Sequence, residues 1–195
     1  MSGLAYASVR LNGRLTGAVY LAYFVLAIGG QTLASHAGVT AGIIANTVAT
    51  LAYAAVVVLL FGLFYPENAT RSAIAAAFGL AGCIVTLLVG FHMLPARVSP
   101  LLFFGPYCAL IGYLIVVSRF VPRALGVLLV LAGIAWLAFA AGLLPGRASV
   151  AAEALGIVAE AAFMLWLLAF GINMARWNAR ATAADDGGSP RAAER

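Results

Sequence analysis

The fold of this protein is decided by a long uncharged stretch, RLTGAVYLAYFVLAIGGQTLASHAGVTAGIIANTVATLAYAAVVVLLFGLFYPE (residues 14–67). Between Arg14 and Glu67 it contains 52 consecutive uncharged residues. A helix of about 20 apolar residues already crosses a bilayer, so this stretch is too long for one span. Turn-forming and polar residues interrupt its middle: Gly29, Gly30, Ser35, His36, Gly38 and Thr40. The stretch therefore predicts two membrane-spanning helices, residues 14–33 and 40–64.

The same pattern continues along the chain, because charged residues and prolines bound every later apolar run. The further spans that we predict are residues 72–94, 100–118, 122–144 and 149–176. We therefore expect an all-α, polytopic membrane protein, with six transmembrane helices in one bundle formed by residues 1–177. Residues 178–195 carry too little apolar surface to order themselves, and we expect a disordered cytoplasmic tail there.

Composition supports a membrane protein and excludes several other classes. Hydrophobic residues make up 65% of the chain and charged residues only 9%, against about 25% charged in a soluble domain. All 11 basic residues are arginines, so a pigment that is held through a lysine Schiff base is excluded. The arginines lie singly between apolar runs, which indicates contact with a lipid bilayer and not with nucleic acid.

The arginines also predict an orientation. Nine of the 11 lie at the N-terminus, in the second and fourth loops or at the C-terminus. Only Arg97 and Arg147 lie on the other side. The positive-inside rule then places both termini in the cytoplasm of a bacterium, with the bundle in its inner membrane.

Residues 101–133 resemble a known family. Four strings in this segment are similar to the bacterial integral membrane family called domain of unknown function 4386. They are Leu101-Leu102-Phe103-Phe104-Gly105, Leu110-Ile111-Gly112-Tyr113-Leu114, Ser118-Arg119-Phe120-Val121-Pro122-Arg123-Ala124-Leu125-Gly126 and Leu129-Val130-Leu131-Ala132-Gly133. Members of that family often have a His near the position of Tyr107, which this chain lacks. The resemblance implies a bacterial integral membrane protein and brings no established activity.

One acidic residue stands out inside a predicted span. Glu160 lies near the middle of the sixth span, where a carboxyl group must be protonated or hydrogen-bonded. Glu153 lies two helical turns earlier, and we expect it to point into the bundle as well. On the second span, Asn46, Thr50 and Tyr53 form one polar stripe. These residues either bond across helix interfaces or line a cavity with Glu160 that is open to the outside, as a ligand or proton site.

A second polar cluster is expected at the outer rim, where His36, His92, Glu153, Arg97 and Arg147 lie. The rim ion pair is the simpler interpretation of Glu153. A metal site is not expected, because no ligand spacing such as His-x-x-x-His supports one, and a haem is not expected either.

Two further features concern helix contacts and anchoring. Arg119 and Arg123 flank Pro122, and we expect them to anchor the bundle at the membrane interface by reaching lipid headgroups. Gly126 with Gly133, and Cys108 with Gly112, offer small-residue faces for close contact with a lipid, a membrane-protein partner or a second copy of the chain. No sequence motif implies a cofactor.

Three functions follow from these features. The first is a binding or accessory membrane module with a polar site around Glu160 inside the bundle. The second is a small transporter or channel in which Glu160 carries a proton or cation. The third, with a single candidate residue, is an intramembrane enzyme that acts on a lipid or quinone.

Overall fold

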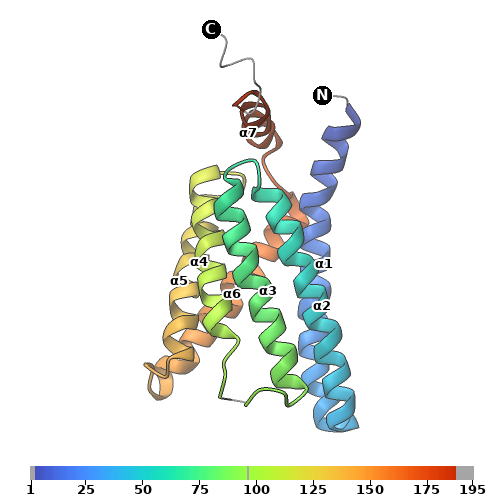
Figure 1. Ribbon diagram of the computed structural model, residues 1–195, viewed down its shortest axis with the longest axis vertical. Coiled ribbons are helices and arrows are strands. Elements are labelled where there is room, and N and C mark those ends of the chain that lie inside the picture. Colours follow the sequence, from blue (N-terminus) through green and yellow to red (C-terminus); the bar gives the residue numbers. More distant parts are fainter. Residues whose placement is uncertain (1–2, 96, 188–195) are drawn as a thin grey trace.

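The computed structural model describes residues 3–95 and 97–187, with the backbone alone for residues 3–12, 33–34, 37 and 185–187. The described residues form seven helices and no strand (Figure 1). These helices are α1 (Gly3–Ala37), α2 (Val39–Phe64), α3 (Ala69–Gly90), α4 (Leu101–Ser118), α5 (Arg123–Ala140), α6 (Gly146–Phe170) and α7 (Met174–Gly187).

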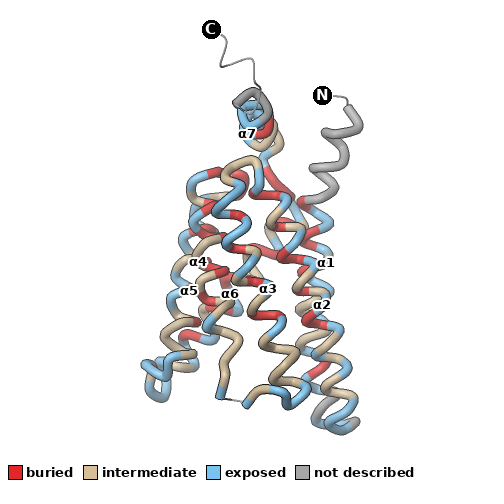
Figure 2. Tube along the Cα trace, in the orientation of Figure 1, coloured by how far each residue is buried: buried red, intermediate tan, exposed pale blue. Residues whose placement is uncertain are grey.

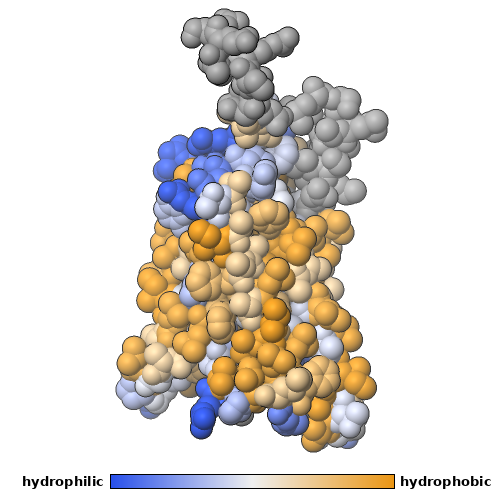
Figure 3. All heavy atoms as spheres, viewed as in Figure 1, coloured by the Kyte–Doolittle hydropathy of each residue, from blue (hydrophilic) through white to orange (hydrophobic). Residues whose placement is uncertain are grey.

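Six helices, α1 to α6, are long and apolar enough to cross a membrane. On the face seen in Figure 3, an apolar belt covers the middle of the molecule, and hydrophilic residues gather toward its two ends. The prediction of an all-α protein with six spans is therefore confirmed. The helix α1 extends beyond its apolar span, Gly13–Thr32, at both ends.

The six spans form a closed ring in which each helix packs against its neighbours in the sequence and α6 closes the ring against α1. Short connections make successive helices antiparallel. The start of α1 and the helix α7 consequently lie at the same end of the molecule (Figure 1). We call this the α7 end, and we call the other, where the α1–α2, α3–α4 and α5–α6 connections lie, the far end.

The α4–α5 pair is held by glycines. A Cβ atom on Gly112 would lie 2.5 Å from the carbonyl oxygen of Gly126, and one on Gly133 would lie 2.5 Å from that of Gly105. Real Cβ atoms do not approach backbone so closely, so these positions require glycine. The predicted face of Gly126 and Gly133 thus serves contact within the chain.

The sixth span ends earlier than its predicted limit of residue 176. The helix α6 stops at Phe170 because Gly171 adopts a φ of 70°, a left-handed conformation that suits glycine. The chain then turns, and the backbone N–H of Asn173 donates to the carbonyl oxygen of Phe120 at 2.8 Å. Asn173 also accepts a hydrogen bond from the backbone N–H of Arg176 at 3.2 Å, which caps the next helix.

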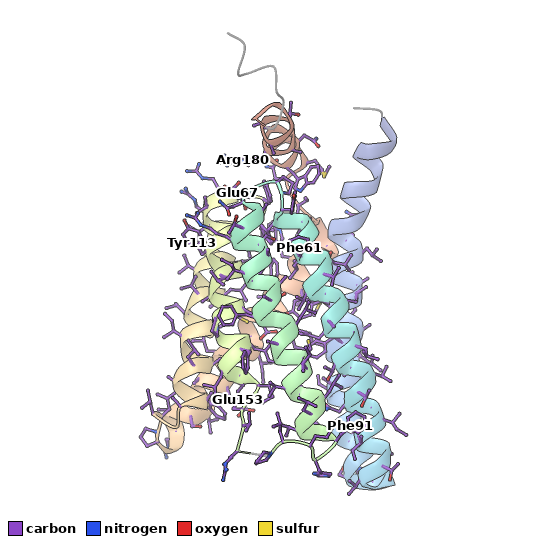
Figure 4. The ribbon with its side chains drawn as sticks, in the orientation of Figure 1. Phe61, Glu67, Phe91, Tyr113, Glu153 and Arg180 are labelled. Atoms are coloured by element: carbon purple, nitrogen blue, oxygen red, sulfur yellow. The ribbon has the colours of Figure 1, made fainter. Side chains whose placement is uncertain are left out.

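The expected disordered tail differs from the structure. Residues 178–187 belong to α7, whereas residues 188–195 lie outside the described residues. Two contacts fix α7 on the bundle: Trp177 Nε1 donates to the carbonyl oxygen of Leu63 at 2.9 Å, and Arg180 Nε lies 3.1 Å from Glu67 Oε2. Figure 4 shows Glu67 and Arg180 together at this end. Composition alone did not reveal these contacts with distant segments.

The two halves of the bundle are packed differently (Figure 2). The largest fully buried side chains lie in the half nearer α7, and they include Leu60, Phe64, Leu114, Ile115, Phe120, Phe163 and Leu167. The half nearer the far end contains two pockets instead. Glu160 lies where these halves meet.

Candidate functional site

Glu160 lies on α6 with 9% of its surface exposed. It projects toward the inside of the ring, where hydrogen-bond donors from four other helices reach its carboxyl group. Five of the six membrane-spanning helices therefore meet at this one side chain.

The Oε2 atom of Glu160 faces α1 and α2. Tyr20 Oη donates to it at 2.6 Å, and Tyr53 Oη donates to it at 3.4 Å. The two rings also contact each other edge to face, with centroids 5.7 Å apart. The short Tyr20 bond is the strong one, and the Tyr53 bond is near the limit of hydrogen-bond length.

The Oε1 atom faces α4 and α5. Trp136 Nε1 donates to it at 3.3 Å, and Cys108 Sγ lies 3.7 Å away. The indole fits because residue 156, one turn before Glu160, is glycine, and a Cβ atom there would overlap the ring of Trp136. Gly156 thus places the tryptophan donor against the carboxyl group.

All four partners of Glu160 are neutral donors. Among the described residues, no arginine or histidine forms an ion pair with it. A carboxyl group removed from water needs hydrogen bonds to offset the loss of hydration, and a carboxylate has about four acceptor positions, which these donors match. The site therefore keeps an acid inside the apolar belt by hydrogen bonds without a countercharge.

Two pockets lie in the half of the bundle nearer the far end, and one of them reaches this acid. The larger has a volume of about 500 Å³ and is lined by α1, α2, α3 and Phe104 of α4. The smaller, about 290 Å³, reaches Glu160 and Trp136. They share four lining residues, Tyr23, Tyr53, Thr86 and Phe104.

Aromatic rings form the boundary between the two pockets. The ring centroid of Tyr53 lies 4.6 Å from that of Tyr23 and 5.1 Å from that of Phe104. A ligand in the larger pocket would contact the faces or edges of these rings.

The polar stripe predicted on the second span is distributed along these pockets. Asn46, Thr50 and Tyr53 all line the larger pocket, and Tyr53 also contacts Glu160. The Thr50 hydroxyl donates to the carbonyl oxygen of Asn46 at 2.7 Å, within its own helix. Asn46 and Glu160 line different pockets, so the structure brings them together only through Tyr53.

The outer-rim residues are not brought together into a site. His36, His92, Glu153, Arg97 and Arg147 are all exposed at the far end, where Figure 4 shows Glu153. Within residues 3–95 and 97–187, no group of three metal-ligating side chains occurs and no ion pair joins Glu153 to an arginine. Our expectation that Glu153 points into the bundle was wrong, because the packing around this first part of α6 leaves it uncovered.

Arg119 and Arg123 lie at the α7 end, where Arg119 follows the last residue of α4 and Arg123 is the first residue of α5, and both are exposed. Arg119 adopts a left-handed conformation with a φ of 57° that ends α4. Arg123 Nε donates to the carbonyl oxygen of Val116 at 3.2 Å, so it satisfies a free carbonyl in the last turn of α4.

Sequence reasoning missed three of the partners of Glu160: Tyr20, Cys108 and Trp136. Each carries a polar hydrogen inside an apolar span, and that was the signal available in the sequence. A fourth missed residue is Tyr107, whose buried hydroxyl has no hydrogen-bond partner among the described residues.

The ring of six apolar helices around a hydrogen-bonded acid defines a polytopic α-helical membrane protein. Residues 87–171, which form α4, α5, α6 and the end of α3, match the family model of DUF4386, a domain of unknown function. The match confirms the resemblance noted in residues 101–133. No curated protein and no solved structure matches the chain.

Proposed function

We propose that this protein is a membrane binding module whose pockets take a small, mainly apolar molecule that is neutral or cationic. The observation that carries this proposal is that two pockets from the far end meet around Tyr53 and that the smaller one ends at Glu160. In the membrane of a bacterium with both termini inside, the far end would face outward, so the ligand would come from outside.

The pocket lining supports this class of ligand. Neither pocket is lined by an arginine or a histidine, and Glu160 is the one ionisable acid in their lining. An anionic ligand would therefore meet no positive charge. Aromatic faces next to an acid favour an organic ammonium group, which gains from both the ring quadrupoles and the carboxyl group.

Packing favours binding over conduction. On the α7 side of Glu160, the bundle is filled by fully buried side chains such as Leu60, Phe64 and Leu114. A solute that reaches Glu160 from the far end would have to displace this core to cross. A blind pocket is the usual form of a ligand site.

Equilibrium binding of benzyltrimethylammonium and of its neutral carbon isostere neopentylbenzene, in detergent micelles, tests the proposal. We expect the ammonium compound to bind about tenfold more tightly, which corresponds to the ~1–2 kcal/mol of a desolvated cation–π and carboxyl interaction. The substitution Glu160→Gln should weaken this preference, because only the aromatic rings then favour the cation, while the protein remains folded. Phenylacetate, an anion of similar size, should not bind.

The matched control is Glu153→Gln, the same change on the same helix at an exposed position. This control should bind the ammonium compound as the wild type does. If the two isosteres bind the wild type equally well, or if Glu160→Gln keeps the full preference, the proposal is wrong. Circular dichroism and size-exclusion chromatography show whether each variant has folded.

Transport is the second candidate, because an acid inside a membrane-spanning bundle is a common site for a proton or cation. Uptake of benzyltrimethylammonium into proteoliposomes, with and without a pH gradient, distinguishes it from binding alone. Uptake that depends on Glu160 would favour the transporter. Enzymatic turnover of a lipid or quinone has less support, because Glu160 is the single acidic side chain that lines the two pockets.

A further inference from the structure

A third pocket lies at the α7 end, far from the site of Glu160. Its volume is about 390 Å³, and it is lined by the α4–α5 connection and by the end of α6 with the start of α7. The hydrogen bond from the N–H of Asn173 to the carbonyl oxygen of Phe120 joins these two segments. The pocket is therefore a built feature of two connections that are distant in the sequence.

Three arginines line this pocket: Arg119, Arg123 and Arg176. Its lining includes no aspartate and no glutamate, and within the described residues the three arginines form no ion pair. Glu67, on the neighbouring α2–α3 connection, is already paired with Arg180. Three positive charges thus line one pocket without an acidic partner among the described residues.

Backbone charges at the pocket do not neutralise these arginines. The carbonyl ends of α4 and α6 point toward this end, but arginine side chains already donate hydrogen bonds to carbonyl oxygens there. Arg123 donates to Val116 in α4, and Arg14 donates to Ala169 in α6 at 3.2 Å. The first turns of α5 and α7 also begin at the pocket, and helix N-termini favour anions. The local field therefore attracts a negative group.

The other wall of the pocket is aromatic and faces the apolar surroundings. Trp166 and Phe170 lie on the last turns of α6, with ring centroids 4.5 Å apart, and 63% of the surface of Phe170 is exposed. Tryptophan at the end of a membrane span is typical of the headgroup level of a bilayer. The pocket thus has a basic side and an apolar side. At this level of the bilayer, the charged headgroup and the apolar acyl chains of a phospholipid also meet.

We propose that Arg119, Arg123 and Arg176 bind the headgroup phosphate of an anionic glycerophospholipid whose acyl chain lies against Trp166 and Phe170. A soluble phosphate compound would use the arginines but would gain nothing from the two rings. This lipid site is independent of the ligand pocket at Glu160.

Native mass spectrometry of delipidated protein, titrated with phosphatidylglycerol, phosphatidylcholine or glycerol 3-phosphate, tests the proposal. Phosphatidylglycerol should bind most tightly, and its affinity should fall as salt is added. In the double variant Arg119→Asn and Arg176→Gln the affinity should fall about fivefold for each arginine removed. Asparagine is chosen at residue 119 because it tolerates the left-handed backbone there.

The control is Arg147→Gln, which removes an exposed arginine at the far end and should leave the affinity unchanged. Melting of the double variant without lipid should match that of the wild type. Equal binding of phosphatidylglycerol by the double variant and the wild type would overturn the proposal. Glycerol 3-phosphate binding as tightly as phosphatidylglycerol would also overturn it, because the site would then serve a soluble phosphate.

Discussion

At the scale of single residues, the buried tyrosines Tyr20 and Tyr107 differ in whether their hydroxyl groups form a hydrogen bond. Tyr20 donates its hydroxyl to the carboxyl group at 2.6 Å, whereas the buried Tyr107 hydroxyl has no hydrogen-bond partner among the described residues. Interhelical hydrogen bonds in membranes contribute about 0.6 kcal/mol on average and up to about 1.7 kcal/mol. The bond of Tyr20 to an acid belongs near the upper limit of that range.

We therefore expect Tyr20→Phe to lower the free energy of unfolding by about 1–2 kcal/mol, because it removes the shortest donor to a buried acid. Tyr107→Phe should leave stability unchanged or raise it slightly, because it removes a buried hydroxyl that gains nothing from the fold. Unfolding in mixed micelles with increasing denaturing detergent measures both variants. Equal losses from the two substitutions would contradict the assigned hydrogen bonds.

At the scale of helices, how closely two neighbouring helices pack depends on whether a glycine lies at their interface. In α6, Gly156 leaves the space that the indole of Trp136 fills, and the indole then reaches Glu160. In α2, by contrast, nothing lies within 4 Å of the Cβ position of Gly62. The sequence does not distinguish a glycine that is packed against a neighbouring helix from one with open space beside it.

The substitution Gly156→Ala should destabilise the protein by about 2 kcal/mol or more, because the added methyl group displaces the indole and breaks its hydrogen bond. Gly62→Ala should have no cost and should stabilise α2 by up to about 1 kcal/mol, the difference in helix propensity. Tryptophan fluorescence reports the displaced indole, and thermal melting gives the order of stability. A Gly156→Ala protein as stable as the wild type would refute the packing of α5 against α6.

The spans themselves could be predicted because charges and prolines bound them, and charge cannot remain in hydrocarbon at low cost. The end of α6 could not, since Gly171 acts through a left-handed turn in the middle of an apolar run. The helix α7 was missed for a different reason. Its order depends on Trp177 and Arg180 contacting the α2–α3 region, and such tertiary contacts leave no local pattern.

At the scale of the whole molecule, the bundle has a filled half and a hollow half, with Glu160 between them. The acid could be recognised from the sequence because it is rare in a span. The polar hydrogens of Tyr20 and Trp136 mark these residues as candidates, but nearly uniform apolar helices do not show which face turns inward, so their contact with the acid could not be predicted. Rotation of each helix about its axis is set by packing in the complete ring.

This asymmetry predicts which positions water can reach and from which side. In a background with Cys83→Ala and Cys108→Ser, a cysteine at Asn46 lies in the larger pocket at the far end, whereas one at Ala179 is exposed on α7. With both termini in the cytoplasm, a membrane-impermeant maleimide added to intact bacteria should label Asn46→Cys. It should label Ala179→Cys only after the membrane is permeabilised.

A cysteine at Leu60, inside the filled half, is the negative control and should stay unlabelled in both conditions. Labelling of Ala179→Cys in intact cells, with Asn46→Cys protected, would reverse the orientation that the arginines predict. The pocket would then open toward the cytoplasm, and the ligand would come from inside the cell. Labelling at Leu60 would instead show that water passes Glu160, and the protein would be a conduit rather than a closed binding site.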